Sequence, residues 1–365
     1  MQSRIPLARR NLLADPRRLI AGAAAVGLAI MLIMLLDGLR NGINRSVTAY
    51  EDNVGADLYL AQPGTQNFFG AVSQIPRSSV DLVRAEPDVD WASPVRTFLA
   101  IISLHDRKVP TSIIGWVPGQ QGGPWRIYDG RAPQTDNEVA VGRVMANRHK
   151  LRIGDSLEIM GRNFRIVGTS TDTFMLSFIF MTHASTDLLL NSPDTTSFVL
   201  IGTDRPSDVK AELANTGLAV KSRDEFASKD LVVMTRAYAV PIDMMRVVAF
   251  AIGILVIALS IYTAIMDRRR EYGIVKAMGA KRNDLITLAL RQSLILATLG
   301  LVVGSLFFIA SRAIITTLRP QFAVELSPAG VARAIIATVF MAILASILPA
   351  LRLAQLEPAI AYRGG

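Results

Sequence analysis

Apolar residues in this chain gather in four blocks that are separated by segments of mixed composition. The blocks cover residues 19–36, 247–266, 292–311 and 334–351, and none of them contains a charged side chain. At about 1.5 Å of rise per residue, helices of this length cross most of a hydrocarbon core that is about 30 Å thick. The pattern therefore predicts four transmembrane helices.

The first block has an alternative interpretation as a cleaved signal peptide, because arginines precede it. Its apolar run is longer than the roughly 7–15 residues of a signal sequence. The sequence that follows, Asp37-Gly38-Leu39-Arg40, also lacks the small residues of a cleavage site. We expect the block to remain in the protein as a membrane anchor.

The segment between the first two blocks, residues 37–246, has the composition of a folded domain. Residues 41–51 have a helical pattern and would extend the first span as a stalk. Alternating or β-branched apolar runs predict strands at 56–60, 98–104, 111–117, 138–144 and 156–167, with turns at 105–108 and 161–163. The fold class expected is membrane α-helical, with four transmembrane helices in a 1+3 arrangement, plus an extracytoplasmic α+β domain.

The formal charge of +9 reflects basic residues that flank the apolar blocks. Lys and Arg are abundant in 1–18 and 267–291, whereas 312–333 has only three of them. Because short cytoplasmic segments carry the excess of Lys and Arg, this asymmetry predicts that both termini are cytoplasmic. It also favours membrane lipid over nucleic acid as the partner of these charges. The tail, 352–365, would then be cytoplasmic.

No catalytic signature is present in the sequence. The three histidines, His105, His149 and His183, have no spacing typical of a metal site. The chain also lacks a nucleophile elbow and a phosphate-binding G-x-x-x-x-G-K-[ST] loop. We therefore expect a non-catalytic protein that binds no cofactor itself. Without cysteine, the domain must rest on its own packed core.

Two spans contain pairs of small residues four positions apart. Ala23 and Gly27 form one pair in the first block, and Gly300 and Gly304 form another in the third. Such pairs allow two helices to approach closely. A specific helix interface and ordinary packing are both compatible with this spacing.

The segment 267–284, which reads DRRREYGIVKAMGAKRND, directly follows the second block. Tyr272, Val275 and Met278 are three residues apart, so a short helix here would have one apolar stripe and one basic side. A solvated loop whose charges only set topology is the alternative. The segment closely resembles the coupling segment of the MacB, LolC and FtsX permease superfamily. The matching residues that this resemblance assigns to ATPase coupling are Arg270, Glu271, Tyr272, Gly273, Ile274, Lys276, Ala277, Met278, Gly279 and Ala280.

Other segments resemble the same superfamily. Residues 8–13 are similar to an amphipathic helix before the first span, 138–167 to part of the periplasmic core domain, and 353–362 to the closing motif. Residues 55–58 look most like the DevC-type exporters. The resemblance implies a complex of two copies of this chain with two copies of an ABC ATPase subunit, and ATP and Mg²⁺ would be bound by that ATPase. An extracytoplasmic adaptor is a further partner that is compatible with the resemblance.

The function implied by the resemblance is that of an ABC transporter permease in a bacterial inner membrane. Its extracytoplasmic domain would move when the partner hydrolyses ATP, and would act on a lipid, a peptide or another hydrophobic substrate. An alternative is an FtsX-like regulator that activates a cell-wall hydrolase and moves no solute. A third interpretation, a receptor or adhesin without an ATPase, leaves the basic segment after the second block unexplained.

Overall fold

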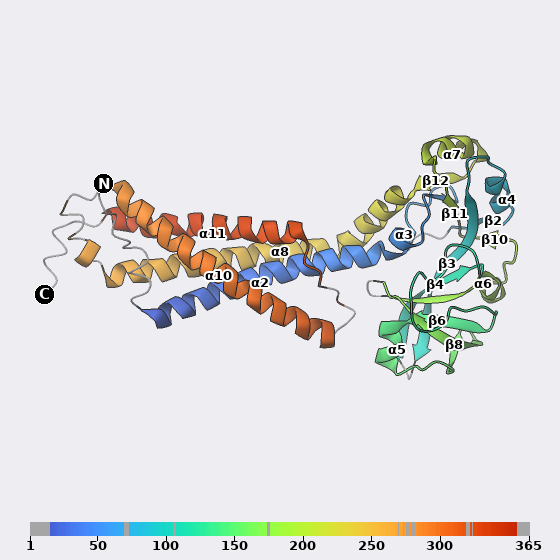
Figure 1. The fold of residues 1–365 in the computed structure, drawn as a ribbon, viewed down its shortest axis with the longest axis horizontal. Helices are drawn as coiled ribbons and strands as arrows, with labels where there is room; N and C mark the ends of the chain where they lie inside the picture. Colours follow the sequence, from blue (N-terminus) through green and yellow to red (C-terminus); the bar gives the residue numbers. More distant parts are fainter. Residues whose placement is uncertain are drawn as a thin grey trace. The chain divides into compact units, whose positions relative to one another are not determined.

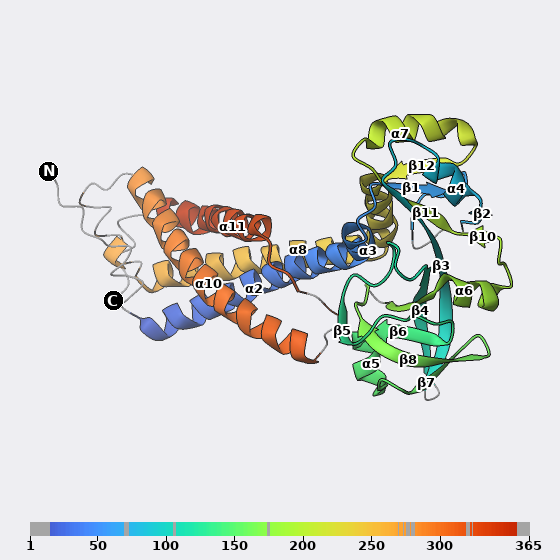
Figure 2. The ribbon, with the colours of Figure 1, turned by 45° about the vertical axis from the view of Figure 1, so that its right-hand side comes forward.

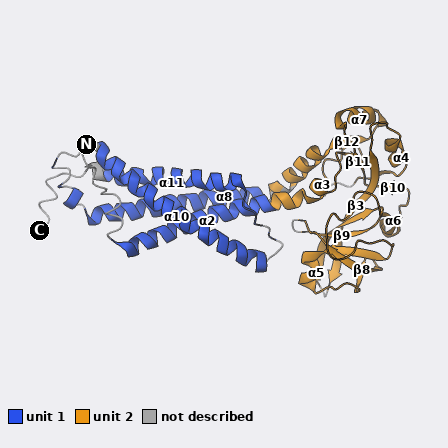
Figure 3. Cartoon of the chain, in the orientation of Figure 1, with its two compact units in different colours: residues 1–42, 238–365 blue, residues 43–237 orange. Residues whose placement is uncertain are grey.

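The computed structural model describes residues 15–68, 73–104, 107–173, 176–268, 270–272, 274, 278, 282–318, 322 and 324–355. The chain divides into two compact units, which Figure 3 colours separately. The helical unit comprises Met1–Gly42 and Tyr238–Gly365, and the globular unit comprises Ile43–Ala237.

Four long helices dominate the helical unit (Figure 1): α2 (Pro16–Val47), α8 (Arg223–Asp267), α10 (Arg282–Leu318) and α11 (Pro328–Gln355). Each contains a stretch that is long and apolar enough to cross a membrane, within Pro16–Val47, Tyr238–Asp267, Asn283–Leu318 and Pro328–Arg352. The helices are longer than the charge-free blocks of the sequence. Only the part inside the hydrocarbon must be free of charge, so a helix can continue through charged residues at either end.

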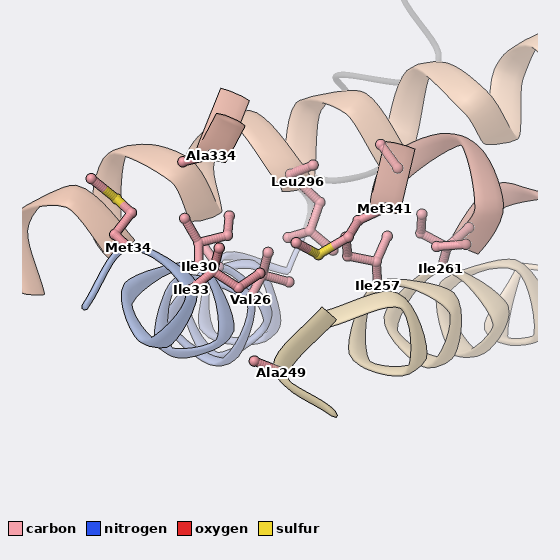
Figure 4. Packing of buried hydrophobic residues seen from close by; sticks show 14 of the residues in the cluster. Val26, Ile30, Ile33, Met34, Ala249, Ile257, Ile261, Leu296, Ala334 and Met341 are labelled. Atoms are coloured by element: carbon pink, nitrogen blue, oxygen red, sulfur yellow. The ribbon is translucent and has the colours of Figure 1, made fainter. Parts of the chain in front are cut away.

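The core of the helical unit is built mainly from β-branched and small residues on facing helices. Figure 4 shows Val26 and Ile30 of α2 near Ile257 of α8, with Leu296 and Met341 supplied by α10 and α11. Many large apolar side chains elsewhere on these helices are exposed. This distribution fits a bundle whose outside meets lipid, because lipid removes the penalty that water imposes on exposed apolar surface.

The globular unit is built around a mixed sheet with the strand order β12-β1-β11-β3-β4-β9-β6-β8-β5, and β7 pairs with β8. The strands span, in chain order, β1 Leu58–Ala61, β2 Ile75–Pro76, β3 Trp91–Leu104, β4 Arg107–Trp116, β5 Ile127–Gly130, β6 Glu138–Gly142, β7 Ser156–Ile159, β8 Arg162–Ser170, β9 Ser177–Thr182, β10 Thr195–Thr196, β11 Phe198–Gly202 and β12 Ala219–Ser222. Strands β2 and β10 form a separate pair.

Short helices cover this sheet, as Figure 2 shows from a second side. They are α3 (Ala49–Asn53), α4 (Ser79–Arg84), α5 (Arg143–His149), α6 (His183–Leu190) and α7 (Pro206–Leu213), and a 3₁₀ turn, η1 (Ala214–Thr216), follows α7. The predicted extracytoplasmic α+β domain is confirmed as a mixed α/β fold. The two predicted hairpins are present as β3–β4 and β7–β8, and both are antiparallel.

Apolar side chains of the globular unit form three separate clusters. The one nearest α3 is rich in aromatic rings: Tyr50 stacks on Phe68 with ring centroids 4.6 Å apart, and Tyr59 lies 5.3 Å from Phe226. Phe226 belongs to α8, so the first turns of α8 are part of the core of the globular unit. Large buried rings of this kind hold the helices and the sheet together without any disulfide.

Candidate functional site

The candidate site is the segment that follows α8, at the end of the helical unit that carries Asp267. Beyond α8, the backbone amide of Tyr272 donates a hydrogen bond of 3.2 Å to the carbonyl oxygen of Arg268. The backbone amide of Met278 donates one of 3.0 Å to the carbonyl oxygen of Ile274. Both are turns of helical type. Five of the predicted coupling residues, Gly273, Lys276, Ala277, Gly279 and Ala280, lie outside the described residues.

Tyr272 is the residue that fixes this segment to the bundle. Its side chain is buried and belongs to the same apolar cluster as Ile265 of α8 and Leu285 of α10. Its hydroxyl oxygen accepts a hydrogen bond of 3.3 Å from Nε2 of Gln292, which is buried on α10. The phenol therefore has both an apolar contact and a polar partner, as buried tyrosines usually do.

Ile274 and Met278 differ from Tyr272, because both are exposed; Met278 has 75% of its surface accessible. The expected single stripe of Tyr272, Val275 and Met278 is therefore not what forms, since Tyr272 is buried and Met278 is exposed, while Val275 lies outside the described residues. The reason is that Tyr272 packs on its own bundle. The exposed apolar atoms are left to Ile274 and Met278.

Charged side chains surround these two apolar residues. Glu271 is largely exposed and lies 3.7 Å from Arg268, and Arg270 is exposed as well. Arg18 of α2 pairs with Asp267 at the end of α8. A cavity of about 180 Å³ lies beside this pair and is lined by Arg18, Arg268, Leu19, Ile261, Ala264 and Leu296, among others. The site therefore offers a charged surface that contains exposed apolar atoms.

The small residues in the spans bring α2 and α10 together. A Cβ atom on Gly300 would lie 2.4 Å from Cγ1 of Val26, and one on Gly27 would lie 3.1 Å from the amide nitrogen of Gly304. Ala23, one turn before Gly27, is buried in the same core. Figures 1 and 2 both show α10 crossing α2. The crossing therefore occurs where the side chains are smallest.

A chain of ion pairs links three helices at the opposite end of the helical unit. The carboxylate of Asp37 on α2 accepts hydrogen bonds from Arg246 of α8 (2.9 Å) and from Arg333 of α11 (2.8 and 3.0 Å). Arg246 also donates to Asp243 over 3.0 Å, and Asp243 accepts from Arg40 over 2.9 Å. Asp37 is the buried member of this network.

No metal centre is found among the described residues. No group of three or more His, Asp or Glu side chains in them is placed to hold a metal ion. His183 is buried on α6 with Nδ1 at 3.2 Å from Asp187 and Nε2 at 3.2 Å from Thr196. Burial, together with Arg96 and Arg77, lowers the pKa of His183 to about 3, so it is neutral at physiological pH. It serves the packing of the domain.

Two family models match the sequence. Residues 21–216, more than half of the chain, match the MacB-like periplasmic core domain, and residues 244–358 match the FtsX-like permease C-terminal domain. The chain belongs to the MacB/FtsX family of ABC transporter permeases. It is a membrane protein of this family, with four candidate spans, and the MacB-like match covers most of the globular unit together with part of the first span.

Relatives with curated names agree with this assignment. An uncharacterised ABC transporter permease of Mycobacterium bovis is 27% identical over 95% of this chain and 96% of its own length. A protein of Staphylococcus haemolyticus named as the hemin transport system permease HrtB is 20% identical over 91% of this chain and 92% of its own. The macrolide export ATP-binding/permease protein MacB of Bradyrhizobium diazoefficiens is 25% identical over 70% of this chain and 33% of its own.

Some residues of the site were not anticipated from sequence. Asp37, Arg246 and Arg333 were recognised only as the ends of apolar blocks. Nothing in a one-dimensional pattern shows that charges some 200 or 300 positions apart meet in space. Gln292 gave a weak signal as a polar residue at the start of an apolar block, and the structure shows that it is the partner of Tyr272.

Proposed function

We propose that this chain is the membrane subunit of an exporter or mechanotransmission complex, in which a separate ATPase docks on the segment 268–280. The observation that carries this proposal is the contrast between buried Tyr272 and exposed Ile274 and Met278. An anchored turn that presents apolar atoms among charges has the composition of a protein interface, with an apolar centre and a polar rim. A loop that only set membrane topology would have no need for exposed Met278.

The orientation proposed places both termini and the segment 268–280 in the cytoplasm of a bacterial inner membrane. The count of Lys and Arg supports it, because 267–291 is far richer in them than 312–333. The globular unit is then extracytoplasmic, in keeping with the match to a periplasmic core domain.

Force would pass through α8. This helix contains residues of both units, from Phe226 in the aromatic core to Ile265 beside Tyr272. When the ATPase subunits close on ATP, the docked segment shifts, and α8 transmits the displacement to the globular unit. A helix packed at both ends transmits a displacement because its neighbours are nearly incompressible.

The proposed partners and cofactors follow from assigning ATP hydrolysis to a separate ATPase and force transmission to this chain. ATP and Mg²⁺ are bound by the ATPase, present in two copies, and this chain forms a dimer with a second copy of itself. Membrane lipid surrounds the exposed faces of the spans. An extracytoplasmic adaptor is a further partner that the globular unit could bind.

The substrate class proposed is hydrophobic or amphipathic, such as a lipid or an apolar peptide. The names of two relatives, which refer to hemin transport and macrolide export, support it. The globular unit also exposes Leu99 and Ile101 on β3. The charged residues of the described spans lie towards the ends of the helices. In the described residues, no charged side chains would therefore line a polar route through the middle of the bilayer.

The experiment is purification of the full chain from its native membrane in mild detergent, followed by identification of the proteins that accompany it. We expect an ABC ATPase in near-stoichiometric amount, and ATP hydrolysis in the purified complex. Replacing exposed Glu271 with Lys should release the ATPase, and replacing exposed Glu212 of α7 with Lys should not. Retention of a fully active ATPase by Glu271→Lys would contradict the docking role.

A further inference from the structure

The globular unit buries two carboxyl groups against each other where α3 meets the first turns of α8. Glu51 of α3 and Asp230 of α8 are both completely inaccessible to solvent. Asp230 is hydrogen-bonded to Phe68 of the aromatic cluster, and Asp230 acts directly on Glu51, whose pKa it raises. Burying one charge in such surroundings is costly, and burying two like charges side by side is far more so.

The two carboxyl groups differ in the donors that they receive. Asp230 accepts hydrogen bonds from the backbone amide of Phe68 over 2.7 Å and from Nδ2 of Asn67 over 3.2 Å. Within the part of the chain that the structure describes, neither side-chain oxygen of Glu51 receives a hydrogen bond from an amide, a hydroxyl or a basic side chain of another residue. Hydrogen bonds to the charged form stabilise it, so Asp230 is the group that holds the negative charge.

We propose that Glu51 and Asp230 form a buried proton-binding site, in which protonated Glu51 donates its O–H to the carboxylate of Asp230. The shared proton supplies the donor that Glu51 lacks and removes one of the two charges. It also ties α3 to α8, two helices that lie near the beginning and the end of the globular unit in the sequence. Loss of the proton leaves two adjacent carboxylates in an apolar core and pushes the two helices apart.

The groups that face the pair fit this assignment. Asp52 on α3 is a further negative charge, and Arg223 on α8 is the positive group whose field reaches the neighbouring Tyr59 on β1. The hydroxyl of Tyr59 is buried without a partner in the described chain. Burial raises the pKa of Glu51 well above its ordinary value, and the Asp230 charge raises it further. The pair binds one proton as a unit.

The test is thermal unfolding of the full chain in detergent between pH 5 and pH 9. A carboxyl whose pKa is raised by folding stabilises the fold at low pH, and this contribution is lost as pH rises from about 4.5 towards the folded pKa. Relative to Glu51→Gln, the wild type should lose stability over that interval, and the ratio of its unfolding equilibrium constant to that of the variant should rise up to about tenfold per pH unit. Glu51→Gln, which keeps a neutral donor, should flatten the profile and be more stable than the wild type at pH 8.5.

Glu212→Gln on exposed α7 is the matched control and should keep the slope of the wild type. Parallel profiles for Glu51→Gln and the wild type would overturn the proposal. So would a stability that rises with sodium or calcium concentration only while Glu51 is present, because the occupant would then be a metal cation.

If Glu51→Gln does not fold, infrared spectroscopy of the wild type tests the proposal. A protonated carboxyl band should persist at pH 7 and vanish at alkaline pH, and its absence at pH 7 would contradict the assignment.

Discussion

The carbonyl oxygen of Gly27 on α2 lies so close to Gly304 of α10 that a Cβ atom at position 304 would be only 2.7 Å from it. No ordinary side-chain contact is as short, and the atom in the way belongs to the backbone. The two helices therefore cross at a point that only glycine can occupy on α10.

Gly304→Ala is expected to force α2 and α10 apart and to destabilise the helical unit by about 1–3 kcal/mol, as overpacking in a core does. The control is Gly22→Ala, whose Cβ would lie at an ordinary 3.4 Å from Leu296 and Ser260. The measurement is the apparent Tm of each variant in the same detergent. Equal Tm values for both alanine variants would show that the crossing is not tight.

Asp37→Asn is expected to loosen the attachment of α8 and α11 to α2, because Arg246 and Arg333 both lose the charge that they bind. Removing one partner of a fully buried pair costs roughly 3–5 kcal/mol, and the partial exposure of Arg333 reduces this cost. Asp243→Asn alters a half-exposed carboxylate and should cost about 1 kcal/mol or less.

The measurement for both aspartate variants is the fraction that remains monodisperse after heating in detergent. A smaller loss for Asp37→Asn than for Asp243→Asn would contradict the view that Asp37 is the centre of the network.

His183 makes a contribution to the stability of the globular unit that should be lost as pH drops below about 6.5, opposite in sign to the contribution of Glu51. His183 has its pKa lowered to about 3 by burial, so the unfolded chain binds a proton that the folded chain does not. This contribution is complete above pH 6.5 and is lost as pH falls towards 3. Thermal unfolding of wild type and His183→Gln between pH 6.5 and pH 4 measures it. The variant should have the shallower slope, and an equal slope would show that His183 does not titrate in this way.

Tyr272→Ala is expected to release the segment after α8 from the bundle, because it removes both the apolar contact and the acceptor of Gln292. Tyr272→Phe keeps the ring and loses only the hydrogen bond. If α8 transmits force, stimulation of the partner ATPase by substrate should fall strongly in the alanine variant and little in the phenylalanine variant. Equal stimulation in Tyr272→Ala and wild type would place the coupling elsewhere.

The sequence was most informative where a one-dimensional pattern determines the structure. The apolar blocks predicted four helices because lipid imposes length and composition on any span. Strands β3, β4, β7 and β8 were predicted from the local alternation of apolar and polar residues and from turn residues such as Gly161, which adopts a φ of +79°. Parallel pairing of β4 with β9 was not foreseen, since it joins segments about 65 residues apart and depends on the sheet as a whole.

The site was predicted less completely than the fold. The motif drew attention to the segment that contains Tyr272 and Met278, but periodicity gave them the same environment, whereas Tyr272 is buried and Met278 is exposed. Whether an apolar side chain packs on its own bundle depends on partners such as Gln292, 20 positions away. The Glu51–Asp230 pair had no signal in sequence, because a Glu in a helical segment ordinarily faces solvent.

The central claim is that the exposed apolar atoms after α8 form the contact with a separate ATPase. It is tested most directly by placing a photoreactive amino acid at position 278 and irradiating living cells. Position 160, an exposed Met in the globular unit, is the control. The account predicts a crosslinked product that contains an ABC ATPase from position 278 and none from position 160. Crosslinks from position 278 to lipid alone, or an ATPase captured equally from both positions, would contradict it.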